Sequence, residues 1–248
     1  SGTAGNYITY MSDSPTNAVV FGFYISGSYI RIIGFQMTHP SNLDYEAVRV
    51  SGGKHVEVLD NYIHNVSTSG AGSGVTYGGA SYLVVRGNTI AYTGSPGNNN
   101  GSGAKAIGNI SGGSVPVLIE YNKISHTTDY LTPEGGYHIY RNNVLGPTTT
   151  SDFGGTPHVD GYQPNEGTTN SFMEANWHVD NAISDSHLYL DELAANHHIT
   201  LVKNVSIRSG DTLLVQFRIS RNHYVAHNTF GQVGYGPRGG PPSGGAFY

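Results

Sequence analysis

Cysteine is absent from this chain of 248 residues, and charged residues make up only 12% of it. Without cysteine there are no disulfide bridges, no thiolate zinc sites and no cysteine nucleophile. The charged share is about half the usual one, which argues against helical bundles, coiled coils and charge-rich disordered chains. No apolar run approaches the roughly 18 residues that a membrane span needs, so no membrane partner is expected.

Positive charge is scarce as well. Four lysines are present, the formal net charge is -5, and no basic cluster occurs. Proteins that bind nucleic acids need a basic surface for the phosphates, so DNA and RNA are not expected as partners. Glycine is abundant, with 35 residues, and so is tyrosine, with 18. This composition is typical of a β protein rich in turns.

A short pattern, apolar-x-apolar-x-x-Asn-x-apolar, recurs along the chain. Its repeats are separated by 20 to 34 residues. This spacing, with short alternating strands, predicts a β-solenoid in which the asparagines stack as a ladder at a tight corner. The asparagine position is occupied by Asn61, Asn88 and Asn122, then in weaker copies by Asn142, Asn176, Asn204 and Asn228, and in an early copy by Phe35.

These repeats resemble the coils of the pectate lyase superfamily, over nearly the whole chain. The opening segment 2–9 is similar to the first coil of many secreted members. The resemblance implies an all-β fold, a right-handed parallel β-helix formed as a single-stranded solenoid of about eight coils. We expect this domain to cover residues 1–230. The Gly- and Pro-rich segment 231–248 does not repeat and is predicted to be a cap or tail.

A further strand lies between successive asparagine positions. Coils of such a solenoid stack about 4.8 Å apart, so equivalent positions form columns along one face. Two places into this strand the column is mostly apolar and is predicted to be core. At the first position the column is polar and contains Glu46, Ser73, Lys105, Asp129, Asp160 and His187. A cation, two carboxylates and an imidazole on consecutive coils form a candidate catalytic site, with Lys105, Asp129, Asp160 and His187 as the catalytic candidates.

Candidate substrate-binding residues surround this column. The segment from His158 to Gln163 resembles the His-x-Asp-Gly-x-Gln strand of several carbohydrate-active β-helix proteins, which makes both of these end residues candidates. Glu46 and Arg49 lie on an earlier coil of the same face. A second column, four residues beyond the asparagine position, is expected to place His126 and Asp180 beside the two aspartates.

Two chemistries fit these residues. In β-elimination on a uronate polysaccharide, Lys105 would be the base, and Asp129 and Asp160 would hold Ca²⁺, as in calcium-dependent β-helix lyases. In hydrolysis, Asp129 and Asp160 would be the carboxylate pair of a glycoside hydrolase, with Lys105 and His187 tuning them. A third alternative is a non-catalytic carbohydrate-binding or adhesion solenoid.

A polysaccharide lyase is the leading hypothesis. The expected partner is a polysaccharide, and the only expected cofactor is Ca²⁺, with no organic cofactor. The resemblance further implies a secreted protein, and we expect a monomer.

Overall fold

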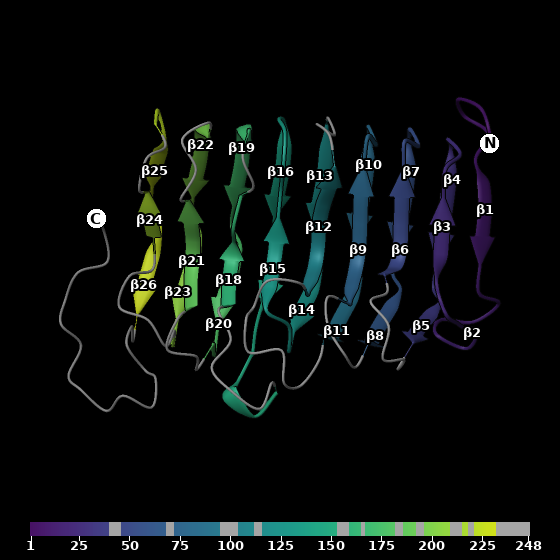
Figure 1. The fold of residues 1–248 in the computed structure, drawn as a ribbon, viewed down its shortest axis with the longest axis horizontal. Coiled ribbons are helices and arrows are strands. Elements are labelled where there is room, and N and C mark those ends of the chain that lie inside the picture. The colour runs from purple at the N-terminus through teal and green to yellow at the C-terminus, as the bar shows by residue number, and fades with distance from the viewer. Residues whose placement is uncertain are drawn as a thin grey trace.

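The chain winds into three parallel sheets, which it visits in turn. The structure is a computed structural model that describes residues 1–39, 46–67, 72–94, 104–111, 116–152, 159–164, 167–181, 186–191, 196–208, 215–217 and 221–231. Each turn of the chain adds one strand to each sheet, and the strands of a sheet follow one another along a single long axis (Figure 1). The predicted all-β parallel β-helix is therefore confirmed.

The first two sheets each have nine strands within the described residues. The first sheet consists of β1 (Ile8–Met11), β4 (Ile30–Ile33), β7 (Val56–Leu59), β10 (Leu83–Arg86), β13 (Val117–Glu120), β16 (His138–Arg141), β19 (Thr169–Glu174), β22 (His197–Val202) and β25 (Tyr224–Ala226). The second sheet consists of β2 (Val19–Val20), β5 (Gln36–His39), β8 (Tyr62–Val66), β11 (Thr89–Thr93), β14 (Lys123–Ser125), β17 (Val144–Leu145), β20 (Trp177–Val179), β23 (Val205–Ile207) and β26 (Thr229–Gly231).

The third sheet has eight strands in the described part of the chain. It consists of β3 (Phe23–Ile25), β6 (Glu46–Ser51), β9 (Ser73–Gly78), β12 (Lys105–Ser111), β15 (Asp129–Thr132), β18 (Val159–Tyr162), β21 (Ser186–Asp191) and β24 (Val215–Phe217). The helical content of the described residues is one 3-10 turn, η1 (Thr150–Asp152), and none of them forms a helix long and apolar enough to cross a membrane. Of the predicted tail, Gly231 ends β26, and the remainder lies outside the described residues.

Alternation of side chains fills the space between the sheets. In β7, Val56 and Val58 are fully buried, whereas Glu57 and Leu59 point outward and are half-buried. The same alternation in each coil stacks aliphatic residues into one continuous core along the axis. The apolar column predicted for the third sheet is part of this core, and its members are buried: Val48, Val75, Ile107, Leu131, Tyr162 and Tyr189.

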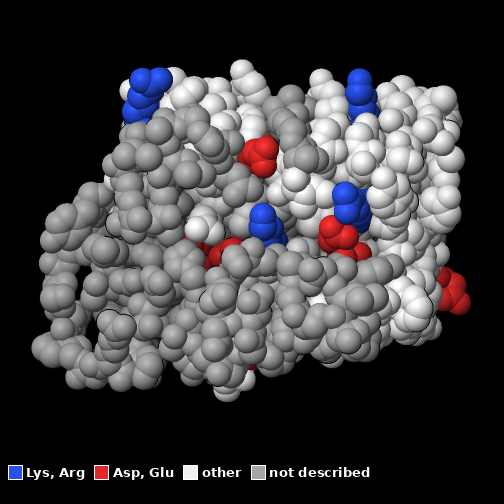
Figure 2. All heavy atoms as spheres, viewed as in Figure 1, with Lys and Arg blue, Asp and Glu red and all other residues white. Residues whose placement is uncertain are grey.

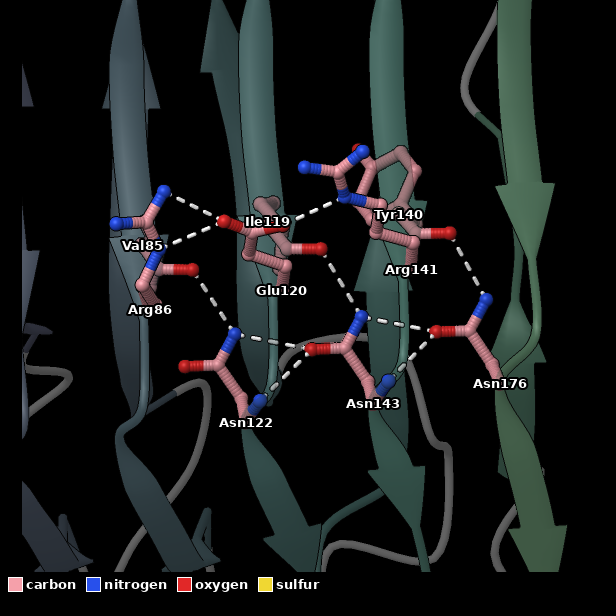
Figure 3. A network of polar contacts seen from close by, with 9 residues as sticks. All are labelled: Val85, Arg86, Ile119, Glu120, Asn122, Tyr140, Arg141, Asn143 and Asn176. Atoms are coloured by element: carbon pink, nitrogen blue, oxygen red, sulfur yellow. Dashed lines mark hydrogen bonds and ion pairs between the residues drawn. The ribbon is translucent and has the colours of Figure 1, made fainter.

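A ladder of buried asparagines joins the coils between the first and second sheets (Figure 3). In each rung before the last, the side-chain amide donates to the side-chain oxygen of the next asparagine and to a main-chain carbonyl; Asn228, the last rung, donates to the Leu201 carbonyl. Asn122 Nδ2, for example, lies 3.0 Å from Asn143 Oδ1 and 3.0 Å from the Val85 carbonyl oxygen. At the start of the ladder, Phe35 stands at the asparagine position, as the repeat predicts, and its backbone N–H donates to Asn61 Oδ1. The ladder residues are Asn61, Asn88, Asn122, Asn143, Asn176, Asn204 and Asn228.

One predicted rung is wrong by one residue. Asn143, and not Asn142, belongs to the ladder, because the inward positions of β16 are taken by His138 and Tyr140. Asn142 stands at the preceding corner, where its φ of 55° is left-handed. Asparagine tolerates this conformation better than most residues do, which explains the Asn-Asn pair.

Candidate functional site

The polar column is formed as predicted, at the start of the third-sheet strands. Strand pairing places Lys105 opposite Asp129, and Asp160 opposite His187. The pairing of Leu131 with Tyr162 puts Asp129 opposite Asp160. Four chemically active residues therefore follow one another on β12, β15, β18 and β21. The register on which the candidate site depends is confirmed.

The column faces outward because the two residues after it both face inward. In β12, Ala106 and Ile107 are both fully buried. In β18, a Cβ on Gly161 would lie 3.2 Å from the ring of buried His178, so the position after Asp160 also faces the core. Two successive inward residues interrupt the usual alternation of side chains. The first and fourth positions therefore share the outer face, as the ion pair of Glu46 and Arg49 on β6 shows.

Asp129 and Asp160 form a buried carboxyl pair. Asp129 is 4% exposed and Asp160 is fully buried. Burial, and then the charge of Asp160, raise the pKa of Asp129 well above its usual range, although the Lys105 ammonium and the Asp160 backbone N–H act in the opposite direction. Within the described residues, Asp129 Oδ1 has no hydrogen-bond partner. The pair can therefore hold a proton at a pH where isolated aspartates are ionised.

Lys105 lies at the edge of this pair. Its side chain is only partly buried, and it crosses the position of Gly108, where a Cβ would lie 2.8 Å from Lys105 Cδ. The same Cβ would lie 2.2 Å from Thr132 Oγ1, on the strand that carries Asp129. The absence of a side chain at Gly108 thus leaves the space through which Lys105 reaches toward β15.

Glu46, Arg49 and Gln163 lie on the same sheet. Glu46 and Arg49 form an ion pair of 3.3 Å on β6, two strands before Lys105. Gln163 follows β18, and its backbone N–H donates to the Leu131 carbonyl at 3.0 Å. This contact aligns Gln163 with Thr132 on the outer face. Both are at the fourth position of their strands, whereas the carboxyl pair is at the first. Figure 2 shows acidic and basic side chains adjoining one another near the middle of the visible surface.

His126 and Asp180 occupy corresponding turns, but their side chains bind other residues. Both have left-handed backbones, with φ of 52° and 57°. His126 stacks on Tyr92 at 4.3 Å, and its Nδ1 lies 3.0 Å from Asp152 Oδ1. Asp180 forms a two-point ion pair with Arg208, and the second contact, from Nη2 to Oδ2, is 2.7 Å. The contacts of these two residues are thus with Asp152 and Arg208, and not with the carboxyl pair.

Two candidates are described less fully. His158 lies outside the described residues, and for His187 the structure gives the backbone position alone. Sequence reasoning missed Gly108 and Thr132, which flank Lys105. Both occupy the fourth position of their strands, which forms the next outward column, and this position could have indicated them. A glycine and a threonine are common in strands, however, so neither residue type pointed to a site.

Asp129 and Asp160 supply hard carboxylate oxygens, which calcium prefers, but calcium takes six to eight oxygen ligands. In the part of the chain that the structure describes, no group of three or more His, Cys, Asp or Glu residues is arranged to hold a metal ion. The Lys105 ammonium on the adjacent strand also opposes a cation there. The described residues therefore do not make up a calcium site by themselves.

Comparison with solved structures shows a likeness of fold. The alginate lyase from Paenibacillus sp. str. FPU-7 matches with a TM-score of 0.50 and 18% identity, over 93% of this chain and 84% of that one. The tailspike protein of E. coli bacteriophage HK620 matches with a TM-score of 0.52 and 11% identity, over 91% of this chain and 46% of that one. Pectate lyase Pel9A matches with a TM-score of 0.47 and 15% identity, over 93% and 59% of the two chains.

The alginate lyase and the tailspike protein are carbohydrate-active proteins built as parallel β-helices, so the resemblance seen in the repeats is confirmed at the level of fold. No family model matches the chain, and no curated protein matches it. This chain spans less than two thirds of the tailspike and Pel9A chains.

Proposed function

We propose that this protein cleaves a uronate-containing polysaccharide by β-elimination at the polar column. The observation that carries the proposal is the proton-holding pair of Asp129 and Asp160 next to the Lys105 cation on the adjacent strand. β-Elimination needs a group that neutralises the uronate carboxylate, a base and an acid. These three groups supply one of each.

Each residue then has one role. The Lys105 ammonium binds the uronate carboxylate, which makes the adjacent C5 proton more acidic. Asp160, the other carboxyl group of the pair, takes this proton as the C4–C5 double bond forms. Asp129, whose pKa is raised, donates its proton to the glycosidic oxygen as the C4–O bond breaks. Return of the proton from Asp160 to Asp129 restores the enzyme for the next cycle.

This assignment differs from the sequence-based hypothesis, in which Lys105 was the base. The raised pKa of Asp129 is the reason, because a carboxyl pair that shares one proton can serve as both acid and base. No step depends on calcium. The sequence-based expectation of Ca²⁺ at Asp129 and Asp160 stays a prediction, and activity with EDTA and with added CaCl₂ tests it.

The test is absorbance near 235 nm during incubation with polygalacturonate, alginate and their carboxyl-reduced forms. We expect absorbance to rise only with polymers that keep their carboxylates. Asp129→Asn, Asp160→Asn and Lys105→Ala should each lower kcat/KM by about a hundredfold or more. Lys123→Ala, which removes an exposed lysine on the second sheet, is the matched control and should react as the wild type does. Full activity of Asp160→Asn and Lys105→Ala would overturn the proposal.

Hydrolysis is the second candidate, and the same carboxyl pair favours it. Asp129 would protonate the leaving oxygen, and Asp160 would act as base or nucleophile. New reducing ends without absorbance at 235 nm, including on the carboxyl-reduced polymers, would assign the pair to hydrolysis. Binding without either product would support the non-catalytic solenoid.

We also propose that the protein is a monomer and is secreted. Size-exclusion chromatography tests the first of these predictions, and fractionation of the source cells tests the second.

A further inference from the structure

Three parallel rows of side chains cover the outer face of the first sheet, away from the polar column. Strands β10, β13 and β16 pair in register there. The rows are spaced two residues apart, so each strand contributes one residue to each row. The ring row contains Tyr82, Pro116 and Tyr137, the apolar row Val84, Leu118 and Ile139, and the arginine row Arg86, Glu120 and Arg141.

The ring row begins as a stack of aromatic side chains. Tyr29 and His55 stack with their centroids 4.7 Å apart, and His55 and Tyr82 follow at 4.6 Å with a 2° angle between the rings. All three residues have left-handed backbones at the corner before their strands. On the next strand Pro116 takes this place, so the aromatic stack ends at Tyr82. Tyr82 is 52% exposed and is the terminal ring of the stack.

A cavity of about 360 Å³ lies beside this ring. This volume is within the range of small-molecule sites. Glu57 also contributes to the lining, but its charge is balanced by Arg31, whose Nε lies 2.6 Å from Glu57 Oε2. The cavity thus has an apolar floor, formed by Val84, Leu118 and Ile139, and is bounded by the Tyr82 ring and by Pro116.

The arginine row runs along the other side of the apolar row. Figure 3 shows its three members, with Glu120 between the two arginines. Arg86 and Arg141 bind the two oxygens of one carboxylate, Glu120, each at 2.5 Å. The Glu120 side chain is 2% exposed, whereas those of Arg86 and Arg141 are 48% and 42% exposed. Arg86, Glu120 and Arg141 together carry one net positive charge. Glu174, the next residue of the row beyond Arg141, is paired with Lys203 at 3.3 Å. The shared Glu120 anchor holds both planar groups in place, with N–H donors left over for a ligand.

We infer that this groove binds an oligosaccharide that carries carboxylates. A pyranose ring has an apolar C–H face that suits the Tyr82 ring and the apolar row. Its carboxylates and hydroxyls would meet Arg86 and Arg141, which favour planar anions. The groove lies on the first sheet and the polar column on the third, so the inference does not depend on the proposed cleavage.

The experiment measures binding in the Asp160→Asn protein, which is designed not to consume its ligand. Oligogalacturonate and its carboxyl-reduced counterpart serve as probes in isothermal titration calorimetry. Tyr82→Ala should weaken the binding of both probes about fivefold to tenfold, as loss of one stacking contact predicts. Tyr224→Ala is the matched control, because Tyr224 is a 58% exposed tyrosine on the same sheet but outside the cavity lining, and it should bind as the parent does.

The arginine row is tested separately. Replacing Arg86 or Arg141 alone leaves Glu120 short of a partner, so the sharper variant is the triple change Arg86→Gln, Glu120→Gln and Arg141→Gln. It should weaken binding of oligogalacturonate and leave binding of the reduced probe unchanged. Equal affinity of Tyr82→Ala and the parent, or no binding of either probe, would overturn the inference. A change of oligomeric state in Tyr82→Ala without a change in affinity would instead assign the face to a second copy.

Discussion

The backbone N–H of Asp160 donates a hydrogen bond to the carboxyl group of Asp129 on the preceding strand of the third sheet. The two aspartates are therefore joined through the main chain as well as by the spacing of the strands. This bond favours the ionised form of Asp129, whereas burial and the Asp160 charge oppose it more strongly. The pair is thus held in place while it keeps a proton.

Stability should fall as pH rises because of Asp129. Its pKa is higher in the folded than in the unfolded protein, so its contribution is fully present below the unfolded value and is lost as pH rises through the folded value. Asp129→Asn cannot ionise and should raise Tm at neutral pH by roughly 2 °C or more relative to the wild type. Thermal unfolding from pH 4 to 8 measures this, and equal pH slopes for the two proteins would show that Asp129 ionises freely.

His138 should produce the opposite slope at acid pH. Burial between the sheets lowers the pKa of His138 from 6.5 to about 4. His138 therefore binds a proton more readily in the unfolded chain than in the folded protein. The contribution of neutral His138 to the free energy of unfolding is complete above pH 6.5 and is lost as pH falls toward 4. Between pH 7 and pH 5 this loss amounts to about 2 kcal/mol. Denaturant unfolding of His138→Phe at the two pH values should show a correspondingly smaller difference, and an unchanged one would contradict the burial argument.

Gly108→Ala should impair the site without a catalytic group being removed. The new Cβ would lie 2.2 Å from Thr132 Oγ1 and 2.8 Å from Lys105 Cδ, so Lys105 must move. We expect kcat/KM to fall about tenfold or more, since small displacements of positioned groups are costly in catalysis. Adding Thr132→Ala removes the tighter contact and serves as the control. It should recover thermal stability but not activity, and recovery of both would mean that the position of Lys105 is unimportant.

The asparagine ladder separates Asn143 from its neighbour Asn142. Asn143→Ala removes the acceptor of the Asn122 backbone and side-chain N–H groups, which lie 3.0 Å away, and the donor to the Ile119 carbonyl. Several buried polar groups lose partners, so a loss of about 3–5 kcal/mol is expected. Asn142→Gly keeps the left-handed corner and should change stability by less than about 1 kcal/mol. Urea unfolding compares the two, and equal losses would refute the assigned register.

The sequence predicted the third-sheet register because an inward and an outward column confirmed each other. Val75, Ile107 and Leu131 had to face the core, which aligned the coils and so placed Lys105 beside Asp129. At Asn142 the prediction was wrong. The core positions of that coil hold His138 and Tyr140, and a histidine does not match the apolar residue that the repeat pattern requires. An Asn-Asn pair then offered two equally good rungs.

Contacts between side chains of different coils were harder to predict. His126 stacks on Tyr92 and contacts Asp152. Asp152 belongs to η1, a segment that is not part of the repeat, so the repeat could not predict this contact. Two arginines converge on Glu120 from both neighbouring strands, which becomes visible only when three coils are aligned at once. Repeats define columns, whereas the direction of a long side chain within a column depends on what lies beside it.

The asparagine ladder also determines how far a disturbance can spread. Each rung is bonded to the rungs directly before and after it, so the ladder behaves as a row of units coupled to their nearest neighbours. Damage to one rung should therefore fade within a few coils along the axis. The coils that carry β12, β15 and β18 can accept new chemistry on their outer face while distant coils keep their stability.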